Sequence, residues 1–257
     1  MKIERICLVV LSSIAIASHC NAAVIILPNA SFESPDFADG SGLVSVDPGI
    51  VFGWNWIGPL NQAQFGIIDP DDFRFHGTTG NGANRLPSPA EGYQYAILGG
   101  AAQSVSSIQN PAPLATIQPF TRYTLSVAAI NEDAQNFGSG LGTLQLSLLA
   151  GPNSVASSSI AYNSFSFGQI RLIESSFTTG DSTDLLVGQD LNAKVTYTAN
   201  FSFGSNGFFD NLVLTATPAP EPGTASLILV ACLGLLVRRN GRHRAAAVRC
   251  QMKYGFT

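Results

Sequence analysis

Between residues 24 and 217 the chain repeatedly alternates apolar and polar residues, and this period of two limits how it can fold. The clearest runs lie at residues 122–130 (RYTLSVAAI), 143–149 (TLQLSLL), 194–203 (KVTYTANFSF) and 208–216 (FFDNLVLTA). Successive side chains of a strand point to opposite faces, so each run is typical of a strand with one buried face. Turn clusters rich in Gly, Pro, Asn and Asp separate the runs. The pattern predicts an all-β domain built as a two-sheet antiparallel sandwich.

Two further features of residues 24–217 constrain this sandwich. In the last run, Leu212 and Leu214 are expected to face one way, and Phe209 and Val213 the other. No cysteine occurs in this stretch, because all four lie at positions 7, 20, 232 and 250. The domain therefore has no disulfide, no thiolate metal site and no thiol nucleophile, and burial of its core must hold it together.

The charge of the predicted domain is strongly negative. Residues 24–217 contain five basic and fifteen acidic residues, a charge of −10, whereas the whole chain carries only −4. Such a domain repels polyanions, so nucleic acid is not expected as a partner. The acids suit divalent cations, or they simply keep an exported protein soluble.

The N-terminus has the layout of a secretory signal peptide. Lys2 and Arg5 precede a short apolar stretch at residues 7–17, and small residues follow up to Ala23. We therefore expect residues 1–23 to be a signal peptide and residues 24–217 to be the exported domain.

A second apolar run, at residues 224–237, lies between a proline-rich segment and a cluster of arginines. As a helix it would span roughly 21 Å, against about 30 Å for the hydrocarbon core of a bilayer. The arginines that follow it should stay in the cytoplasm. We expect a transient transmembrane helix at 224–237, a basic tail at 245–257, and a protein that passes through the inner membrane to the cell envelope or the exterior.

The C-terminal segment 218–244 resembles the PEP-CTERM sorting signal of exopolysaccharide-producing Gram-negative bacteria. The residues that carry the resemblance are Pro220, Glu221 and Pro222, followed by the apolar run and by Arg238 and Arg239. The resemblance implies that an exosortase recognises and processes the protein after its export.

Short motifs in the predicted domain resemble the galactose-binding-like β-jelly roll of carbohydrate-binding modules and DUF642-type proteins. They are the opening N-A-S-F-E at residues 29–33, Gly53-Trp54, the central Y-T-L-S-V at 123–127 and the closing D-N-L-V-L at 210–214. The resemblance implies a jelly-roll sandwich with a structural Ca²⁺ ion held by Glu33 and Asp210. The alternative is that these two carboxylates pair with backbone amides.

Aromatic and amide residues of the loop-rich segment and just after it suggest a glycan-binding surface. The candidates are Trp56, Tyr93 and Gln94, because aromatic platforms and amide groups are typical of sugar sites. The alternative is that the aromatic side chains belong to the core, which is the expectation for Trp54.

No pattern in the sequence indicates catalysis. His76 is the only histidine of residues 24–217, and no G-x-S-x-G motif accompanies it. The sequence therefore favours a non-enzymatic envelope or extracellular-matrix protein that binds or organises exopolysaccharide or a cell-surface glycan. A polysaccharide hydrolase or lyase on the same sandwich, and a structural matrix protein without a small ligand, are the alternatives.

Overall fold

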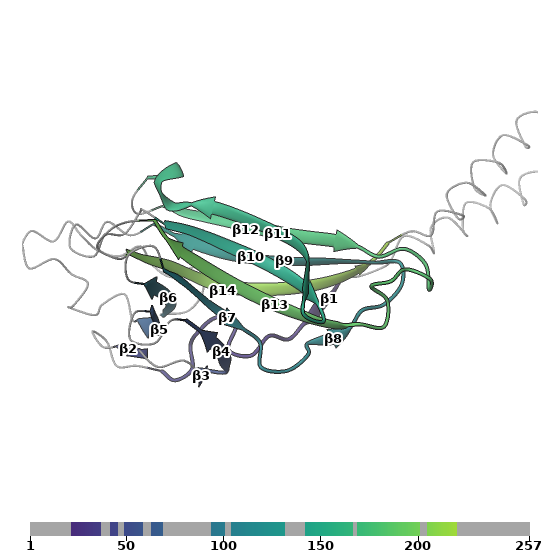
Figure 1. Ribbon diagram of the computed structural model, residues 1–257, viewed down its shortest axis with the longest axis horizontal. Helices are drawn as coiled ribbons and strands as arrows, with labels where there is room; N and C mark the ends of the chain where they lie inside the picture. The colour runs from purple at the N-terminus through teal and green to yellow at the C-terminus, as the bar shows by residue number, and fades with distance from the viewer. Residues whose placement is uncertain are drawn as a thin grey trace, which may run out of the picture. The chain divides into compact units, whose positions relative to one another are not determined.

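The computed structural model describes residues 22–36, 42–45, 49–58, 63–68, 94–100, 104–131, 142–166, 169–200 and 205–219. The chain divides into two compact units, Met1–Pro218 and Ala219–Thr257, and the sandwich belongs to the first. Its strands form two layers that pack face to face (Figure 1).

The first layer, called sheet A, contains seven strands within the described residues. Their order is β12-β9-β14-β6-β5-β2, and β1 pairs with β14. The strands are β1 (Ala23–Ile25), β2 (Gly42–Ser45), β5 (Ala63–Ile68), β6 (Tyr95–Gly100), β9 (Thr121–Ile130), β12 (Ile170–Thr178) and β14 (Ser205–Pro218).

The second layer, called sheet B, also contains seven strands in the described part of the chain. Their order is β11-β10-β13-β7-β4-β3, and β8 pairs with β13. The strands are β3 (Gly49–Val51), β4 (Trp54–Ile57), β7 (Val105–Gln109), β8 (Ala115–Thr116), β10 (Gly142–Ala150), β11 (Asn153–Ala161) and β13 (Asp190–Ala199). A single 3₁₀ turn, η1 (Tyr162–Ser164), follows β11.

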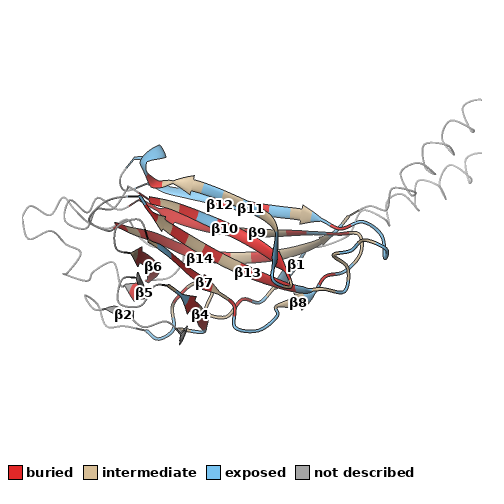
Figure 2. Ribbon diagram, in the orientation of Figure 1, coloured by how far each residue is buried: buried red, intermediate tan, exposed pale blue. Residues whose placement is uncertain are grey.

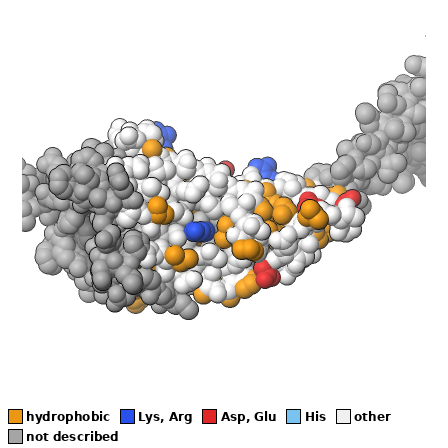
Figure 3. Space-filling view, viewed as in Figure 1, with side chains coloured by type: hydrophobic (Ala, Val, Ile, Leu, Met, Phe, Trp, Pro, Cys, Tyr) orange, Lys and Arg blue, Asp and Glu red, His pale blue; other side chains and the backbone are white. Residues whose placement is uncertain are grey.

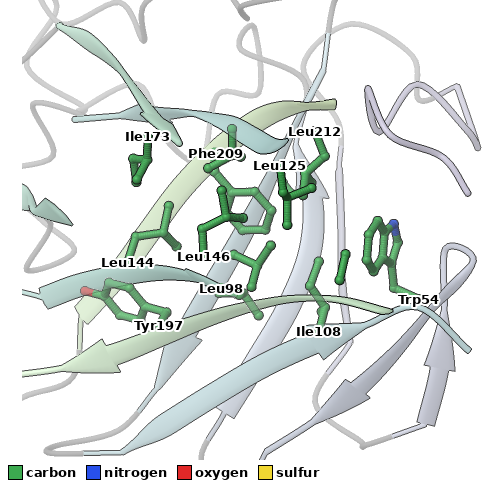
Figure 4. Packing of buried hydrophobic residues seen from close by; sticks show 14 of the residues in the cluster. Trp54, Leu98, Ile108, Leu125, Leu144, Leu146, Ile173, Tyr197, Phe209 and Leu212 are labelled. Atoms are coloured by element: carbon green, nitrogen blue, oxygen red, sulfur yellow. The ribbon is translucent and has the colours of Figure 1, made fainter. Parts of the chain in front are cut away.

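The predicted two-sheet antiparallel sandwich is confirmed, and the apolar face of each long strand forms its core. Leu144, Leu146 and Tyr197 of sheet B face Leu125 and Phe209 of sheet A across the interface (Figure 4). Figure 2 shows the alternation of buried and more exposed residues along these strands. The period of two thus reports directly which side chains line the space between the sheets.

The expected faces of the last strand are wrong in one respect. Phe209 lies in the same core cluster as Leu212 and Leu214, not on the opposite face. The cause is a β-bulge: Asp210 pairs with Ala128 of β9, whereas Val213 pairs with Ser126. From Asp210 to Val213 the chain of β14 advances by three residues, while its partner β9 advances by two, from Ala128 to Ser126. The extra residue on β14 reverses the alternation of its side chains between the two faces.

The described residues contain no helix that is long and apolar enough to cross a bilayer. The apolar run predicted as a helix at residues 224–237 lies outside them, as do residues 1–21 of the predicted signal peptide 1–23 and the tail at 245–257.

Two buried tyrosines fix the start of β14 against sheet B. The Tyr162 hydroxyl donates to the Phe208 carbonyl at 2.6 Å, and the hydroxyls of Tyr197 and Ser205 lie 2.7 Å apart. Gly207 is required beside them, because a Cβ atom there would lie 2.5 Å from Cδ2 of Tyr197. The two rings thereby determine where Phe208 and the residues after it lie.

Alkaline titration should reveal this tyrosine pair. Burial raises the pKa of Tyr197 to about 12 and raises the pKa of Tyr162 well above its usual value. In the unfolded chain both ionise near pH 10, so the native state binds more protons above that pH and loses stability between about pH 10 and 12.

We expect the 295-nm absorbance of the native protein to show tyrosines that ionise only near pH 12 or above, and urea unfolding to become easier from pH 10 upward. Tyr197→Phe should remove the step near pH 12. Native tyrosines that all ionise together near pH 10 would contradict the burial argument.

Candidate active site on the outer face of sheet A

Asp210 is the only Asp, Glu, Lys, Arg or His that is buried among the residues that the structure describes. Its exposed fraction is 0%. A carboxyl group removed from water is costly unless its surroundings or its function compensate, so a single buried one marks a candidate site.

The bulge in β14 determines where this carboxyl group points. Phe208 and Asp210 lie two residues apart before the bulge, so they share the face opposite to Phe209, which lies in the core. Asp210 therefore points away from sheet B, onto the outer face of sheet A.

The backbone of the bulge is held on both sides. The Asn211 amide donates to Oδ1 of Asp210 at 2.6 Å, and the Leu212 amide donates to the Ala30 carbonyl at 2.9 Å. Asn211 itself has a φ of +52°, in the left-handed region that asparagine tolerates better than most residues. The loop before β2 and the bulge thus stabilise each other.

An apolar and aromatic cluster lies on the same outer face. It contains Tyr95 and Ile97 of β6, Ile130 of β9 and Phe208 of β14, all at most 1% exposed and separate from the main core. Phe208 pairs with both Ile97 and Ile130, so the register places Tyr95 beside Asp210 across the next step of the ladder. The rings of Tyr95 and Phe208 meet edge to face, with centroids 5.6 Å apart.

These neighbours suit acid–base chemistry on an apolar molecule. A carboxyl group in apolar surroundings can hold a proton near neutral pH and deliver it to a substrate. Aromatic faces stabilise positive charge that develops close to them. The outer face of sheet A combines both features at one place.

Glu33 lies in the loop between β1 and β2, called the first loop, at the point where this loop contacts the residue before β6. Its Oε1 accepts a hydrogen bond from the Gln94 amide at 2.9 Å. The Gln94 side chain donates to the Pro35 carbonyl at 3.1 Å and is fully buried. Gln94 therefore anchors the first loop, and one oxygen of each of Glu33 and Asp210 pairs with a backbone amide.

The calcium ion predicted at Glu33 and Asp210 finds only part of its ligand shell here. Calcium takes six to eight oxygens. Within the described ranges no three Asp, Glu, His or Cys side chains come together. Two carboxylates from the first loop and from β14 fit such an ion only if backbone carbonyls complete the shell.

Of the three glycan-binding residues predicted from the sequence, the structure describes Trp56 and Gln94, and both are buried. Trp56 is 1% exposed and, like Trp54, belongs to the core between the sheets, so it presents no ring to solvent. Gln94 is buried as described above. Tyr93 and His76 lie outside the described residues, as do the sorting residues Pro220, Glu221, Pro222, Arg238 and Arg239.

Sequence reasoning missed the partners of Asp210. Tyr95 and Ile97 come from the segment GYQYAILGG, where nearly every residue is apolar and no alternation separates the two faces. A strand that is buried on both faces has this signature, and it was the available signal for a second apolar cluster.

Comparisons with known proteins identify the fold's relatives. A family model described as HpiC1-like, HpiC1 cyclase, matches residues 23–215. No curated protein sequence matches the chain.

Three solved structures with the same fold are cyclases from Fischerella. The Stig cyclase Fisc from Fischerella sp. TAU, in complex with (3Z)-3-(1-methyl-2-pyrrolidinylidene)-3H-indole, is 23% identical, with a TM-score of 0.58 over 78% of this chain and all of that one. A cyclase from Fischerella sp. TAU is 24% identical, with the same TM-score and coverage. A cyclase from that source in complex with 4-(1H-indol-3-yl)butan-2-one is 22% identical, with a TM-score of 0.55 over 77% of this chain and 99% of that one.

The family match overturns the functional interpretation of the sequence. The identification with PEP-CTERM and DUF642-type proteins is wrong, because the model that matches the domain describes cyclases. The predicted matrix function and the predicted exosortase and exopolysaccharide partners are therefore wrong as well. The expectation that the protein is not an enzyme is also wrong, because this family is one of cyclases.

Substitutions at Asn211 should test the bulge that aims Asp210. Asn211→Val places a β-branched residue at positive φ and should lower the free energy of unfolding by about 1–2 kcal/mol. Asn211→Gly should cost less than about 1 kcal/mol, because glycine adopts this conformation without strain. Urea unfolding measures both.

Asn153→Val is the matched control, since Asn153 is exposed in a strand of sheet B. Its effect should stay within about 0.5 kcal/mol. Equal effects of Val and Gly at position 211 would show that the backbone there is not strained.

Proposed function

The chain belongs to the HpiC1-like cyclase family, and we propose from this premise that it closes a ring in a small, largely apolar substrate by proton transfer from Asp210. The observation that carries the proposal is the single buried carboxyl group of the described residues, placed among aromatic and aliphatic side chains. Ring closure within one molecule is an isomerisation, so it requires no oxidant, reductant or second substrate.

The proposed reaction has two proton transfers. The Asp210 carboxyl gives its proton to a basic atom of the substrate, such as an imine nitrogen, which leaves a carboxylate and an electron-poor carbon. An electron pair from an alkene or aromatic carbon of the same molecule then forms the new carbon–carbon bond. Loss of a proton from the ring system to the Asp210 carboxylate restores both the neutral product and the acid.

The aromatic neighbours of Asp210 support this reaction class. Tyr95 and Phe208 present ring systems beside the place where positive charge would develop. Their apolar surroundings keep water away from the cationic intermediate, which water would otherwise intercept. The relatives in complex with indole compounds suggest that the substrate class contains an indole or a similar flat heteroaromatic group.

Asp210→Asn should abolish turnover while leaving the fold intact. The amide keeps the shape of the side chain but cannot deliver a proton, so kcat should fall by about 100-fold or more. The assay incubates the protein with indole-bearing alkenes and imines and looks by mass spectrometry for a product of unchanged mass and new retention time. Asp190→Asn, at an exposed carboxylate on sheet B, is the control and should retain turnover.

A structural calcium ion is the competing use of Asp210. Glu33 lies in the first loop, which is tied to the bulge through Ala30, so an ion there would stabilise the same corner. We propose that Glu33 and backbone carbonyls of this loop hold the ion, and that Asp210 is not one of its ligands.

The same variants decide between these two uses of Asp210. EDTA should lower the melting temperature of the wild type and of Asp210→Asn, but not that of Glu33→Gln. A calcium response that is lost in Asp210→Asn as well, together with turnover by that variant above a tenth of the wild-type kcat, would assign the carboxyl to the ion.

Export is proposed from the sequence, on its N-terminal segment and its C-terminal apolar run. The charged start, the apolar stretch and the small residues up to Ala23 support passage through the inner membrane, with residues 224–237 as a membrane anchor. N-terminal sequencing of the protein from a Gram-negative host should find a mature chain that begins near residue 23 or 24 in the envelope or the medium. An intact Met1 on cytoplasmic protein would refute export.

A further inference from the structure

Side chains on the outer face of sheet A become more exposed from Asp210 toward the edge of the sheet. The register aligns Asp210 of β14 with Ala128 of β9 and Leu172 of β12 in one row across three strands. Their exposed fractions are 0%, 6% and 65%. The neighbouring row, Phe208–Ile130–Ile170, ends in the same way, because Ile170 is 40% exposed.

We infer that Ala128, Ile170 and Leu172 form an apolar shelf over which the substrate reaches Asp210 and on which its apolar part rests. This inference rests on the proposed function and names the specificity-determining residues of that same site. On both rows, buried residues give way to exposed apolar ones toward β12, the outermost strand on this side of sheet A in the described chain.

The size of the shelf matches a bicyclic substrate. Neighbouring strands lie 4.7–4.9 Å apart, so two strand steps separate Asp210 from Leu172 by roughly 10 Å. Ala128 between them has a single side-chain carbon, so it takes up less of this row than any larger apolar residue would. A molecule of this length can thus touch Leu172 while its basic atom meets the acid.

The side chains that bound the shelf are polar. The next row contains Ser126 of β9 and the exposed Glu174 of β12. An exposed leucine and isoleucine beside such a border cost solubility without helping the core, so a binding function accounts for them better than packing does. The other large exposed apolar residues of the described chain lie on other elements, among them Leu185 in the connection between β12 and β13.

A neutral fluorescent dye tests the shelf without any knowledge of the true substrate. Nile red fluoresces when it binds apolar surfaces, and we expect it to bind the wild type and to be displaced by 4-(1H-indol-3-yl)butan-2-one. Leu172→Ser should weaken both ligands by about tenfold, because an apolar contact of leucine size is lost. Leu185→Ser is the matched control, since Leu185 is 87% exposed, and it should leave both affinities within about twofold of wild type.

Ala128→Leu is a second variant, which places a larger side chain in the middle of the row, whereas Leu172→Ser removes the apolar side chain at its end. It should weaken the ketone at least as much as Leu172→Ser does, and circular dichroism checks that it has folded. Equal affinities of Leu172→Ser and Leu185→Ser, or dye that the ketone does not displace, would overturn the shelf.

Failure of the shelf and failure of the proposed reaction give different results. If Asp210→Asn abolishes turnover while Leu172→Ser binds the ketone and turns over substrate like Leu185→Ser, Asp210 is the proton donor and the inference of the shelf is wrong. If Asp210→Asn retains wild-type kcat while Leu172→Ser loses the ketone, the shelf binds substrate and Asp210 is not the proton donor.

Discussion

One extra residue in β14 is the constraint on which the rest of the site depends. The core needs Phe209, Leu212 and Leu214 on the same face, but strict alternation would put Phe209 opposite the two leucines. The bulge between Asp210 and Val213 resolves this conflict and sends Asp210 to the outer face. Its cost is a left-handed Asn211 and an interrupted ladder, and the hydrogen bond from Leu212 to Ala30 offsets it by joining the first loop to the sheet. Packing of the core and placement of the acid are therefore two consequences of one backbone irregularity.

The outer faces of sheets A and B differ in the side chains that they carry, and the candidate site with Asp210 lies on that of sheet A. On sheet B the residues that point away from the core include the polar Gln145, Thr196 and Ser107, and also the exposed apolar residues Ile57 and Val105. The face visible in Figure 3 carries few charged side chains, and its apolar ones form small separate groups. On sheet A the corresponding face holds the second cluster around Tyr95 and Phe208. The two outer faces therefore differ in that sheet A carries this separate buried apolar cluster.

The sequence predicts the sandwich well because its long strands each bury one face. Tyr123, Leu125 and Val127 lie in the core as their spacing indicates. It predicts less where the period of two fails. The strand β11 is rich in serine, with only Val155 and Ile160 as large apolar residues, so its edge position and not its pattern makes it a strand. The bulge leaves no signature beyond an Asp-Asn pair, and Tyr95 and Ile97 are more than a hundred residues away from Asp210 along the chain. The acid is visible in the sequence, but its burial and its neighbours are properties of the fold alone.

Burial, and not composition, separates the two functions that this sequence suggests. A glycan site would require aromatic rings that face solvent, and the sequence makes Trp56 a candidate for it while Trp54 is expected in the core. Both are buried between the sheets, where they stabilise the sandwich and cannot touch a ligand. The aromatic rings that accompany an ionisable group are instead Tyr95 and Phe208, on the opposite face of sheet A from the core. A protein that only bound a polar polymer would have no evident use for a buried carboxyl group on the same face as this cluster. The proposed proton transfer during ring closure uses this arrangement, because aromatic and aliphatic side chains keep water from a cation that forms beside them.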